Sequence, residues 1–295
     1  MNSQTTALPP HMESGSIQSE APVNSLPVTY WDYIQVDDLL SLQNPKTDYK
    51  DEEVFILYHQ VTELILKMML HEIRQLSSDP RPESVWIDKT ARLNRYVSML
   101  INSFDVMKHG MNPDEYNTFR RALSPASGFQ SAQFRFVEIY CTRPKNLVRP
   151  EAREHITDSA SAEDYFHDLY WKDAGLNRQT GEKSLTLQLF EDKYLADLTS
   201  LADSVRGATL EERVLAMDAP SDALLTELKQ FDRLYNIEWP LVHLRTAEFY
   251  LERKGEQKAA TGGSDWKKYL HPRFQGRRFF PHLWSESEIA HWGMN

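Results

Sequence analysis

The stretch DEEVFILYHQVTELILKMMLHEIRQLSSDP, residues 51–80, places apolar residues at the spacing of one helix face over most of its length. The positions that follow this spacing are Val54, Phe55, Val61, Leu64, Ile65, Met68, Met69 and Ile73. The pattern predicts one long helix from about residue 53 to 77. Acidic residues 51–53 fall in its first turn, where the helix dipole favours them, and the Asp79-Pro80 step ends it.

The same helical spacing returns along most of the chain. It predicts further helices over about 85–108, 113–121, 128–140, 162–172, 186–204 and 220–253, with a kink or restart at Pro240 in the last one. Alternating β-branched runs are nearly absent, and no repeat or interdomain linker divides the chain. We therefore expect one all-α domain over residues 28–295. Residues 1–27 are rich in Ser, Pro, Thr and Gln, which predicts a disordered or loosely attached tail.

Composition and charge narrow the classes of function. Hydrophobic residues make up 41% of the 295 residues, and 33 basic against 43 acidic side chains give a net charge of −10. This balance argues against nucleic-acid and anionic-membrane binding. The single cysteine, Cys141, excludes an intrachain disulfide and a thiolate metal cluster. The first 27 residues do not resemble a secretory signal and no apolar run is long enough for a membrane span, so we expect a soluble, cytoplasmic protein.

The ten histidines raise the question of a metal site. The stretch HEIRQ at 71–75 begins like a zinc-protease motif, but Gln75 occupies the place of the second histidine. Two other histidines each stand inside a long apolar helix. His59 lies within VFILYHQVTELILK and His243 within WPLVHLRTAEFYL. A histidine on an apolar helix face is more often a core residue than a ligand. One axial histidine is nevertheless sufficient for haem, because the porphyrin supplies the other four nitrogens.

Two further stretches are candidates for ligand binding. EYNTFRRAL, residues 115–123, places Tyr116 and Arg120 on one helix face, where a guanidinium can hold a carboxylate or form a surface contact with the ring. AATGGSDW, residues 259–266, is either a helix cap with a hinge or a lid that brings Thr261 over a ligand. Motifs of serine hydrolases and of nucleotide-binding loops are absent from the sequence.

The stretch LSPASGFQSAQFRF, residues 123–136, contains five consecutive small or turn-forming residues. It is either an elaborate corner or a segment that lies close against a ligand. Small residues such as Ser127 and Gly128 would allow the backbone to approach that ligand.

Taken together, these segments resemble the tryptophan 2,3-dioxygenase family of haem enzymes. The resemblance covers most of the chain beyond residue 28, in the family's order, and SPASGFQSAQFR is close to a family signature. The matching segments are TYWDYIQVDDLLSLQ (29–43), DEEVFILYHQVTELILKMMLHE (51–72), FRRALSPASGFQSAQFRFVE (119–138), HLRTAEFYL (243–251), ATGGSDWKKYL (260–270) and FFPHLW (279–284).

The resemblance implies roles for individual residues in a b-type haem site enclosed by long helices. His243 matches the axial ligand of the haem iron, and His59 matches the distal histidine that bonds the indole N–H and serves catalysis. Arg120 matches the residue that pairs with the substrate carboxylate, and Tyr116 lies beside it. Thr261 matches a loop threonine that contacts the ammonium and carboxylate groups of the substrate.

Other matches concern the walls of the pocket and the oligomer. Phe55 matches an aromatic wall of the indole pocket and Leu123 a nearby apolar contact, while Ser127 and Gly128 lie along the haem. In the family an N-terminal segment reaches into the neighbouring subunit's pocket, which implies a homotetramer. The matching residues of this segment are Tyr30, Tyr33 and Ile34.

The implied reaction is haem-dependent cleavage of the indole C2–C3 bond of L-tryptophan. Ferrous haem and O₂ would give N-formyl-L-kynurenine, a step of tryptophan catabolism in the kynurenine pathway, with both oxygen atoms in the product. One alternative is a haem hydroxylase or monooxygenase of the same superfamily that acts on tyrosine or another indole. A second alternative, of a different class, is a non-catalytic helical interaction protein.

Overall fold

The computed structural model describes residues 27–157, 159–252 and 266–294. Within these ranges the only β-structure is two isolated bridges, so the predicted all-α class is confirmed. The chain divides into two compact units, residues 1–42 and 43–295. The predicted tail lies outside the described ranges except for its last residue, and the predicted domain start at residue 28 stays a prediction. No helix in the described ranges is long and apolar enough to cross a lipid bilayer.

The smaller unit contains two short helices, α1 (Tyr30–Ile34) and α2 (Val36–Leu39). Thr29 caps α1 by accepting a hydrogen bond from the backbone N–H of Asp32 at 3.4 Å. Gln35 separates the two helices because its φ of 53° is left-handed. Neither helix has a buried residue, so the described part of this unit, residues 27–42, has no apolar core of its own.

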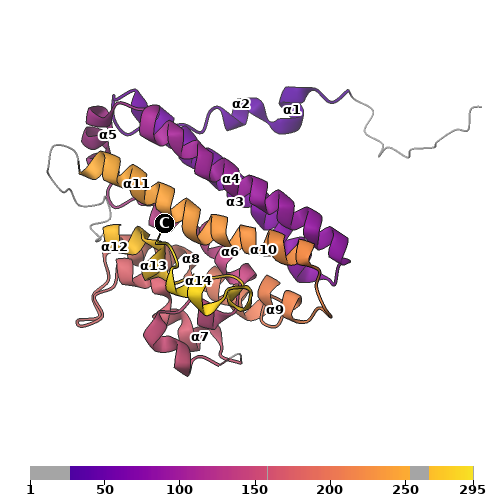
Figure 1. The fold of residues 1–295 in the computed structure, drawn as a ribbon. Helices are drawn as coiled ribbons and strands as arrows, with labels where there is room; N and C mark the ends of the chain where they lie inside the picture. Colours follow the sequence, from indigo (N-terminus) through magenta and orange to yellow (C-terminus); the bar gives the residue numbers. More distant parts are fainter. Residues whose placement is uncertain (1–26, 158, 253–265, 295) are drawn as a thin grey trace, which may run out of the picture. The chain divides into compact units, whose positions relative to one another are not determined.

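Four helices form the main core of the larger unit. They are α3 (Asp51–Ser78), α4 (Glu83–His109), α10 (Asp222–Arg233) and α11 (Trp239–Leu251). α3 lies along α4, and α10 and α11 pack against α4 (Figure 1). The ranges predicted for α3 and α4 are confirmed to within a few residues, because the buried side of each helix follows the apolar spacing.

A second apolar cluster lies between α6 (Ala132–Cys141) and α8 (Leu185–Ser204). α6 also packs against α3, so it joins the two clusters. The range predicted for α8 is confirmed, whereas α6 begins at Ala132, after a 3-10 turn over Gly128–Gln130. Ser131 ends that turn and caps α6 by accepting a hydrogen bond from the N–H of Phe134.

The helix predicted over residues 162–172 is wrong in its length. Only α7 (Ala162–Tyr165) is α-helical there, and 3-10 segments follow over residues 166–168 and 170–174. The backbone pairs with another segment instead, since Arg149 N–H donates to Asp168 O and Tyr170 N–H donates to Leu147 O, each at 2.9 Å. These long-range bonds replace the helical ones.

Several short helices complete the described chain. The sequence analysis did not predict α9 (Leu210–Leu215), although Thr209 and Glu212 form a capping box at its start. The other short helices are α5 (Pro113–Phe119), α12 (Trp266–Leu270), α13 (Pro272–Gln275) and α14 (Glu286–Ala290).

The interruption predicted at Pro240 takes the form of a π-helical segment. Residues Leu234–Glu238 connect α10 to α11 with the wider π hydrogen-bond spacing, and Pro240 stands in the first turn of α11. A proline has no N–H and its ring collides with the carbonyl four residues earlier, here that of Asn236. The wider π turn relieves this clash, so the helical segment continues from α10 into α11 without a break.

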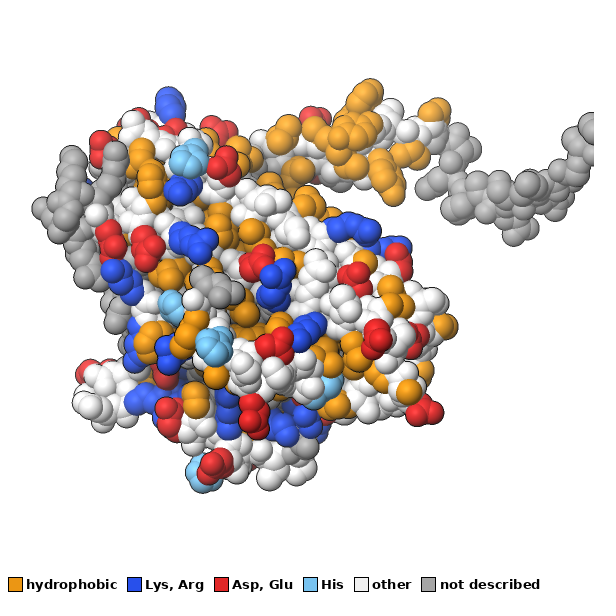
Figure 2. Space-filling model, viewed as in Figure 1, with side chains coloured by type: hydrophobic (Ala, Val, Ile, Leu, Met, Phe, Trp, Pro, Cys, Tyr) orange, Lys and Arg blue, Asp and Glu red, His pale blue; other side chains and the backbone are white. Residues whose placement is uncertain are grey.

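The charge is spread over the surface. On the face drawn in Figure 2, acidic and basic side chains are interspersed among apolar ones. Although the net charge is −10, this face does not form a field of a single sign.

Candidate active site

His59 is a half-buried residue of α3, and a carbonyl group of the same helix determines which ring nitrogen carries the proton. Its Nδ1 is 2.7 Å from the carbonyl oxygen of Phe55. A carbonyl can only accept, so the proton of the neutral ring resides on Nδ1 and Nε2 remains an acceptor. Burial lowers the pKa of His59, against opposing effects of this hydrogen bond and of nearby Glu63.

His243 lies in α11 and combines two properties that rarely occur together. Its side chain is exposed, yet burial lowers its pKa to about 4, with a further contribution from the nearby His59. In the described structure His243 therefore offers an accessible imidazole that is neutral near pH 7, and His59 is close enough to influence its pKa.

Aromatic rings connect the two histidines across α3, α4 and α11. The centroid of the His59 ring lies 5.3 Å from that of Tyr58, which lies 5.8 Å from that of Phe104. Phe104 is in turn 5.5 Å from His243. Burial lowers the pKa of both imidazoles, which keeps both rings neutral near pH 7.

A second group of rings surrounds Phe55, one turn before His59. The Phe55 ring lies 4.1 Å from His59, 5.9 Å from Tyr116 and 5.8 Å from Phe119. Tyr116 packs on Tyr250 of α11 at 4.3 Å, so α5 is held between α3 and α11. Burial raises the pKa of Tyr116, although Arg120 opposes this effect, and the phenol stays protonated.

Arg120 is buried at the end of α5 and is oriented by a neighbour that the sequence analysis did not identify. Its Nε donates to Asn117 Oδ1 at 3.2 Å. The Asn117 amide donates to Pro113 O at 2.9 Å and to Tyr250 O at 3.3 Å. Asn117 thus fixes the guanidinium relative to α11. Its position three residues before Arg120 on the same helix was the available signal.

The segment after Arg120 is anchored to the start of α8. Thr186 Oγ1 donates to Pro125 O and Gln130 Nε2 donates to Thr186 O, each at 3.0 Å. Leu123 packs on the main core, and Ser127 caps the following 3-10 turn. A Cβ atom added at Gly128 would meet no heavy atom within 4 Å, so no described part of the chain excludes a Cβ there.

The structure does not place every predicted site residue. Thr261 lies outside the described residues. Tyr30, Tyr33 and Ile34 belong to the smaller unit, where they expose 72%, 78% and 40% of their surface. The larger unit brings together Phe55, His59, Tyr116 and, through Phe104, His243.

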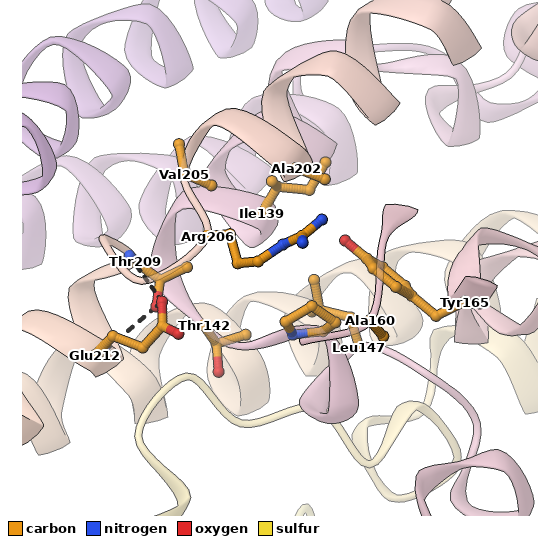
Figure 3. Close-up of a pocket in the computed structure, with 11 residues that line it drawn as sticks. Ile139, Thr142, Leu147, Ala160, Tyr165, Ala202, Val205, Arg206, Thr209 and Glu212 are labelled. Carbon is orange, nitrogen blue, oxygen red and sulfur yellow. Dashed lines mark hydrogen bonds between the residues drawn. The ribbon is translucent and has the colours of Figure 1, made fainter. Parts of the chain in front are cut away.

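Two hollows elsewhere in the larger unit are not lined by the predicted site residues. One lies between α6, α8 and α9 and has a volume of about 10 Å³, the size of a single water molecule (Figure 3). The other has a volume of about 740 Å³ and is lined by Leu241, His271, Arg273, Phe274, Gly293 and Met294. The candidate site is therefore identified by its side chains, because neither of these hollows includes them.

The residues present fit a haem better than a directly bound metal ion. Within the described ranges no group of three or more His, Cys, Asp or Glu side chains could hold a metal. His243 offers one neutral imidazole with an accessible side, which is what an axial haem ligand requires. The open space at Gly128 is compatible with a flat group beside that backbone.

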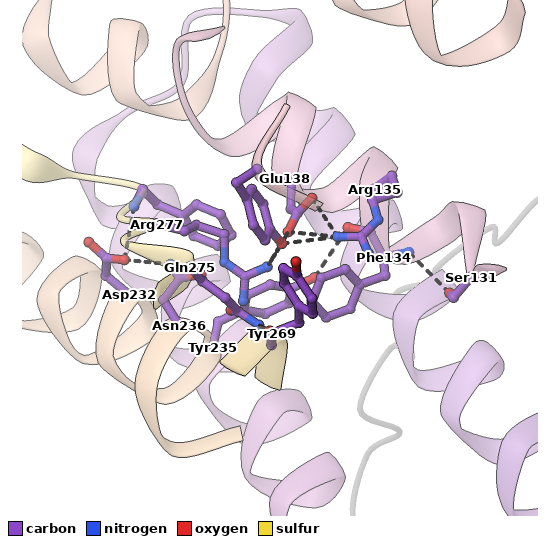
Figure 4. A network of polar contacts seen from close by, with 12 residues as sticks. Ser131, Phe134, Arg135, Glu138, Asp232, Tyr235, Asn236, Tyr269, Gln275 and Arg277 are labelled. Carbon is purple, nitrogen blue, oxygen red and sulfur yellow. Dashed lines mark hydrogen bonds and ion pairs between the residues drawn. The ribbon is translucent and has the colours of Figure 1, made fainter. Parts of the chain in front are cut away.

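A buried polar network attaches the C-terminal segment to α6, the helix that follows the Ser127-Gly128 segment. Glu138 of α6 accepts hydrogen bonds from Arg135, Tyr170 and Arg277 (Figure 4). The Arg277 guanidinium also lies 5.0 Å from the centre of the Phe134 ring. Burial raises the pKa of Tyr170 to about 12 despite the two guanidiniums.

Asp232, at the end of α10, forms a second anchor for this segment. Its carboxylate accepts from the N–H groups of Phe279 and Phe280 at 2.9 and 3.0 Å, and from Trp284 Nε1 at 2.8 Å. Asn236 in the π segment donates to it at 2.6 Å. The turn that precedes the His243 helix is therefore clamped by residues near the end of the chain.

Comparison with known proteins gives a consistent result. The sequence pattern of the tryptophan 2,3-dioxygenase family matches residues 16–171. A tryptophan 2,3-dioxygenase of a Ruegeria species is 31% identical over 271 residues, covering 88% of this chain and 91% of the relative. Those of Bacillus cereus and Exiguobacterium sibiricum are 31% and 30% identical over 268 and 289 residues, with the same shares covered.

Proposed function

The chain belongs to the tryptophan 2,3-dioxygenase family, and from this membership we propose that it cleaves the C2–C3 bond of the indole ring of L-tryptophan with O₂. The product would be N-formyl-L-kynurenine, as in the first step of tryptophan catabolism through kynurenine. The observation that carries the proposal is the pair of neutral histidines, His59 and His243, next to a wall of aromatic rings.

We propose a b-type haem as the cofactor. His243 would hold its iron, and the backbone at Ser127 and Gly128 would lie along it. When bound, the haem supplies the ferrous iron at which O₂ is activated. The support is the accessible but desolvated imidazole of His243 and the open space at Gly128.

His59 would orient the indole ring. Because its Nδ1–H is donated to Phe55 O, its Nε2 can only accept, and the indole N–H is a donor. Its lowered pKa keeps this nitrogen unprotonated near neutral pH. The Phe55, Tyr116 and Phe119 rings beside it provide apolar surface that excludes water from the substrate ring.

Arg120 and Thr261 would hold the amino-acid end of the substrate. A guanidinium oriented through Asn117 can form charge-assisted hydrogen bonds to a carboxylate. Fixing both ends of the substrate removes its rotational freedom, and in well-oriented model reactions such confinement contributes roughly 7–11 kcal/mol.

The decisive experiment measures the product and the origin of its oxygen atoms. Purified protein supplied with haem, reductant, L-tryptophan and ¹⁸O₂ should form N-formyl-L-kynurenine that contains two labelled atoms. A product with one labelled oxygen would favour a monooxygenase. A preparation that takes up no haem would leave only the interaction protein.

The His243→Ala variant tests the haem ligand separately. It should lose the haem Soret band at its usual intensity, while far-UV circular dichroism shows unchanged helix content. The exposed His71→Ala variant, on the outer face of α3, is the matched control and should keep its haem. Normal haem content and activity in His243→Ala would contradict the assignment.

We further propose that the chain forms a cytoplasmic homotetramer in which the N-terminal segment enters the neighbouring subunit's pocket. The support is the exposure of Tyr30, Trp31 and Tyr33, each above half of its surface. Monomeric proteins rarely expose so many large apolar side chains side by side.

A further inference from the structure

One arginine in the stretch after α6 differs from its neighbours in its partners. Arg143 Nη2 pairs with Glu211 at 2.7 Å, and Arg149 Nε pairs with Asp168 at 2.8 Å. Arg153, which follows in the same stretch, forms no ion pair with any described residue. No carboxylate of the described chain therefore neutralises the charge of Arg153 directly.

Arg153 donates only to backbone carbonyls. Its Nε reaches Val148 O at 3.4 Å and its Nη2 reaches Gly276 O at 3.0 Å. These bonds fix the guanidinium against the C-terminal segment, but a neutral carbonyl does not neutralise it. The side chain is half-buried, so water screens the charge only in part.

Arg278, two residues after Gly276, brings a second positive charge to the same place. Its guanidinium lies 5.4 Å from the centre of the Trp292 ring. Its Nε is fully buried and has no hydrogen-bond acceptor among the described residues. The same is true of Nε1 of Trp292, which is 4% exposed. Arg278 and Trp292 therefore each bring one buried N–H donor without an acceptor to this contact.

The positive charge of Arg278 acts on Arg153. Burial lowers the pKa of Arg153, and the nearby Arg278 lowers it further. Burial also lowers the pKa of Arg278. Glu151 and Asp232 act in the opposite direction, but neither forms an ion pair with these arginines in the described chain. Two like charges in a partly desolvated place are unfavourable unless an anion joins them.

We propose that Arg153, Arg278 and Trp292 form a binding site for a phosphate group, either inorganic phosphate or a phosphate monoester. Two guanidiniums match a group that carries close to two negative charges at neutral pH. The planar donors of arginine suit phosphate oxygens, and the indole N–H can donate to a third oxygen. A monocarboxylate would satisfy only half of the charge.

The phosphate site is separate from the candidate active site in its residues. Arg153 stands in a 3-10 segment, Pro150–His155, and the other two residues belong to the C-terminal segment. None of the three contacts His59, Arg120 or His243 in the described structure. Failure of one proposal therefore leaves the other unaffected.

The test measures the unfolding temperature of the purified full-length protein in buffer without phosphate or sulfate. Potassium phosphate should raise this temperature by about 3–5 °C at ten times the dissociation constant, because ligands that bind only the folded state stabilise it. Potassium chloride of equal ionic strength should not. An equal rise in chloride would overturn the proposal, and a larger rise in succinate would overturn the assignment to phosphate.

Variants locate the effect. Trp292→Phe keeps a ring beneath Arg278 but removes the indole N–H, and should weaken phosphate binding about tenfold. Arg153→Gln and Arg278→Gln should lose the response. Arg206→Gln is the control, since Arg206 is ion-paired with Asp203 and should keep the full response. An unchanged response in both Trp292→Phe and Arg153→Gln would overturn the site even if Arg278→Gln fails to fold.

Discussion

His59 has one ring nitrogen bonded to a carbonyl of its own helix, and this bond determines what the other nitrogen can do. Nε2 accepts while the ring is neutral and loses this ability once the ring is protonated. The pKa in the folded chain lies below 6.5, so the neutral form is present above 6.5 and is lost only as the pH falls through the lowered value.

The first prediction follows from the lowered pKa of His59. The KM for L-tryptophan should be constant from about pH 8 to 6.5, and should rise about tenfold per pH unit only below the lowered pKa of His59. Steady-state kinetics across this range measures it. His59→Gln removes the titrating group, so its KM should be less dependent on acid. A wild-type KM that already rises well above pH 6.5 would contradict the role given to His59.

The second prediction concerns Arg120. Arg120→Ala should raise the KM for L-tryptophan roughly 10- to 100-fold, because a hydrogen bond to a charged group contributes about 1.5–3 kcal/mol. Haem content should stay normal. The adjacent Arg121→Ala, which removes an exposed guanidinium, is the control and should leave KM unchanged. An unchanged KM in Arg120→Ala would remove the carboxylate-binding role.

For single residues, the sequence indicated which side chains could form the site, but not the neighbouring residues that hold them in place. Tyr116 and Arg120 share a helix face, and their one-turn spacing is visible in the sequence. The support of Arg120 by Asn117 depends on a hydrogen bond to Tyr250, which is 133 residues further along the chain. No spacing rule reveals such a partner.

At the scale of elements, the end of α10 is held by a buried carboxylate. Asp232 accepts four hydrogen bonds, two of them from backbone N–H groups of the C-terminal segment. The π segment and α11 follow directly. The position of the His243 helix therefore depends on contacts made by residues 279–284.

The third prediction tests this anchor. Asp232→Asn replaces one acceptor oxygen with an N–H₂ group that faces buried donors, and should lower the free energy of unfolding by roughly 3 kcal/mol. Urea denaturation followed by circular dichroism measures the loss. Asp218→Asn, at an exposed site, should change it by less than about 0.5 kcal/mol. A similarly small change in Asp232→Asn would show that the carboxylate is not an anchor.

Element boundaries were predicted well where a helix buries one regular face. α3 and α8 follow the apolar spacing, and both were predicted to within a few residues. The segment after α7 was not, because its backbone bonds to residues 147 and 149 instead of to its own next turn. The short α9 has too few residues for a periodic signal.

At the scale of the whole molecule, the smaller unit exposes its large apolar side chains. Tyr30 and Tyr33 expose 72% and 78% of their surface, and Leu40 exposes 66%. The fourth prediction is that the double substitution Tyr30→Ala and Tyr33→Ala raises the KM for L-tryptophan about tenfold while the unfolding temperature stays within about 2 °C. Leu40→Ala is the control and should leave KM unchanged.

A complementation experiment shows whether the segment crosses between subunits. The Arg120→Ala chain and the Tyr30→Ala, Tyr33→Ala chain should each be weakly active alone. Mixed oligomers should recover activity, because a pocket with intact Arg120 then receives an intact segment from its neighbour. No recovery in oligomers that demonstrably contain both chains would contradict the exchange.

Apolar periodicity was enough to predict the all-α class and the long helices. It also placed His59 and His243 inside two of these helices. Each of these features is local, because burial of one helix face leaves a regular trace over neighbouring residues. The family followed from the order of short motifs. The fit between distant segments could not be read in this way: Arg277 meets Glu138 across 139 residues, and Arg153 meets Gly276 across 123. Such contacts arise only when packed helices bring remote segments together, and they leave no spacing in the chain.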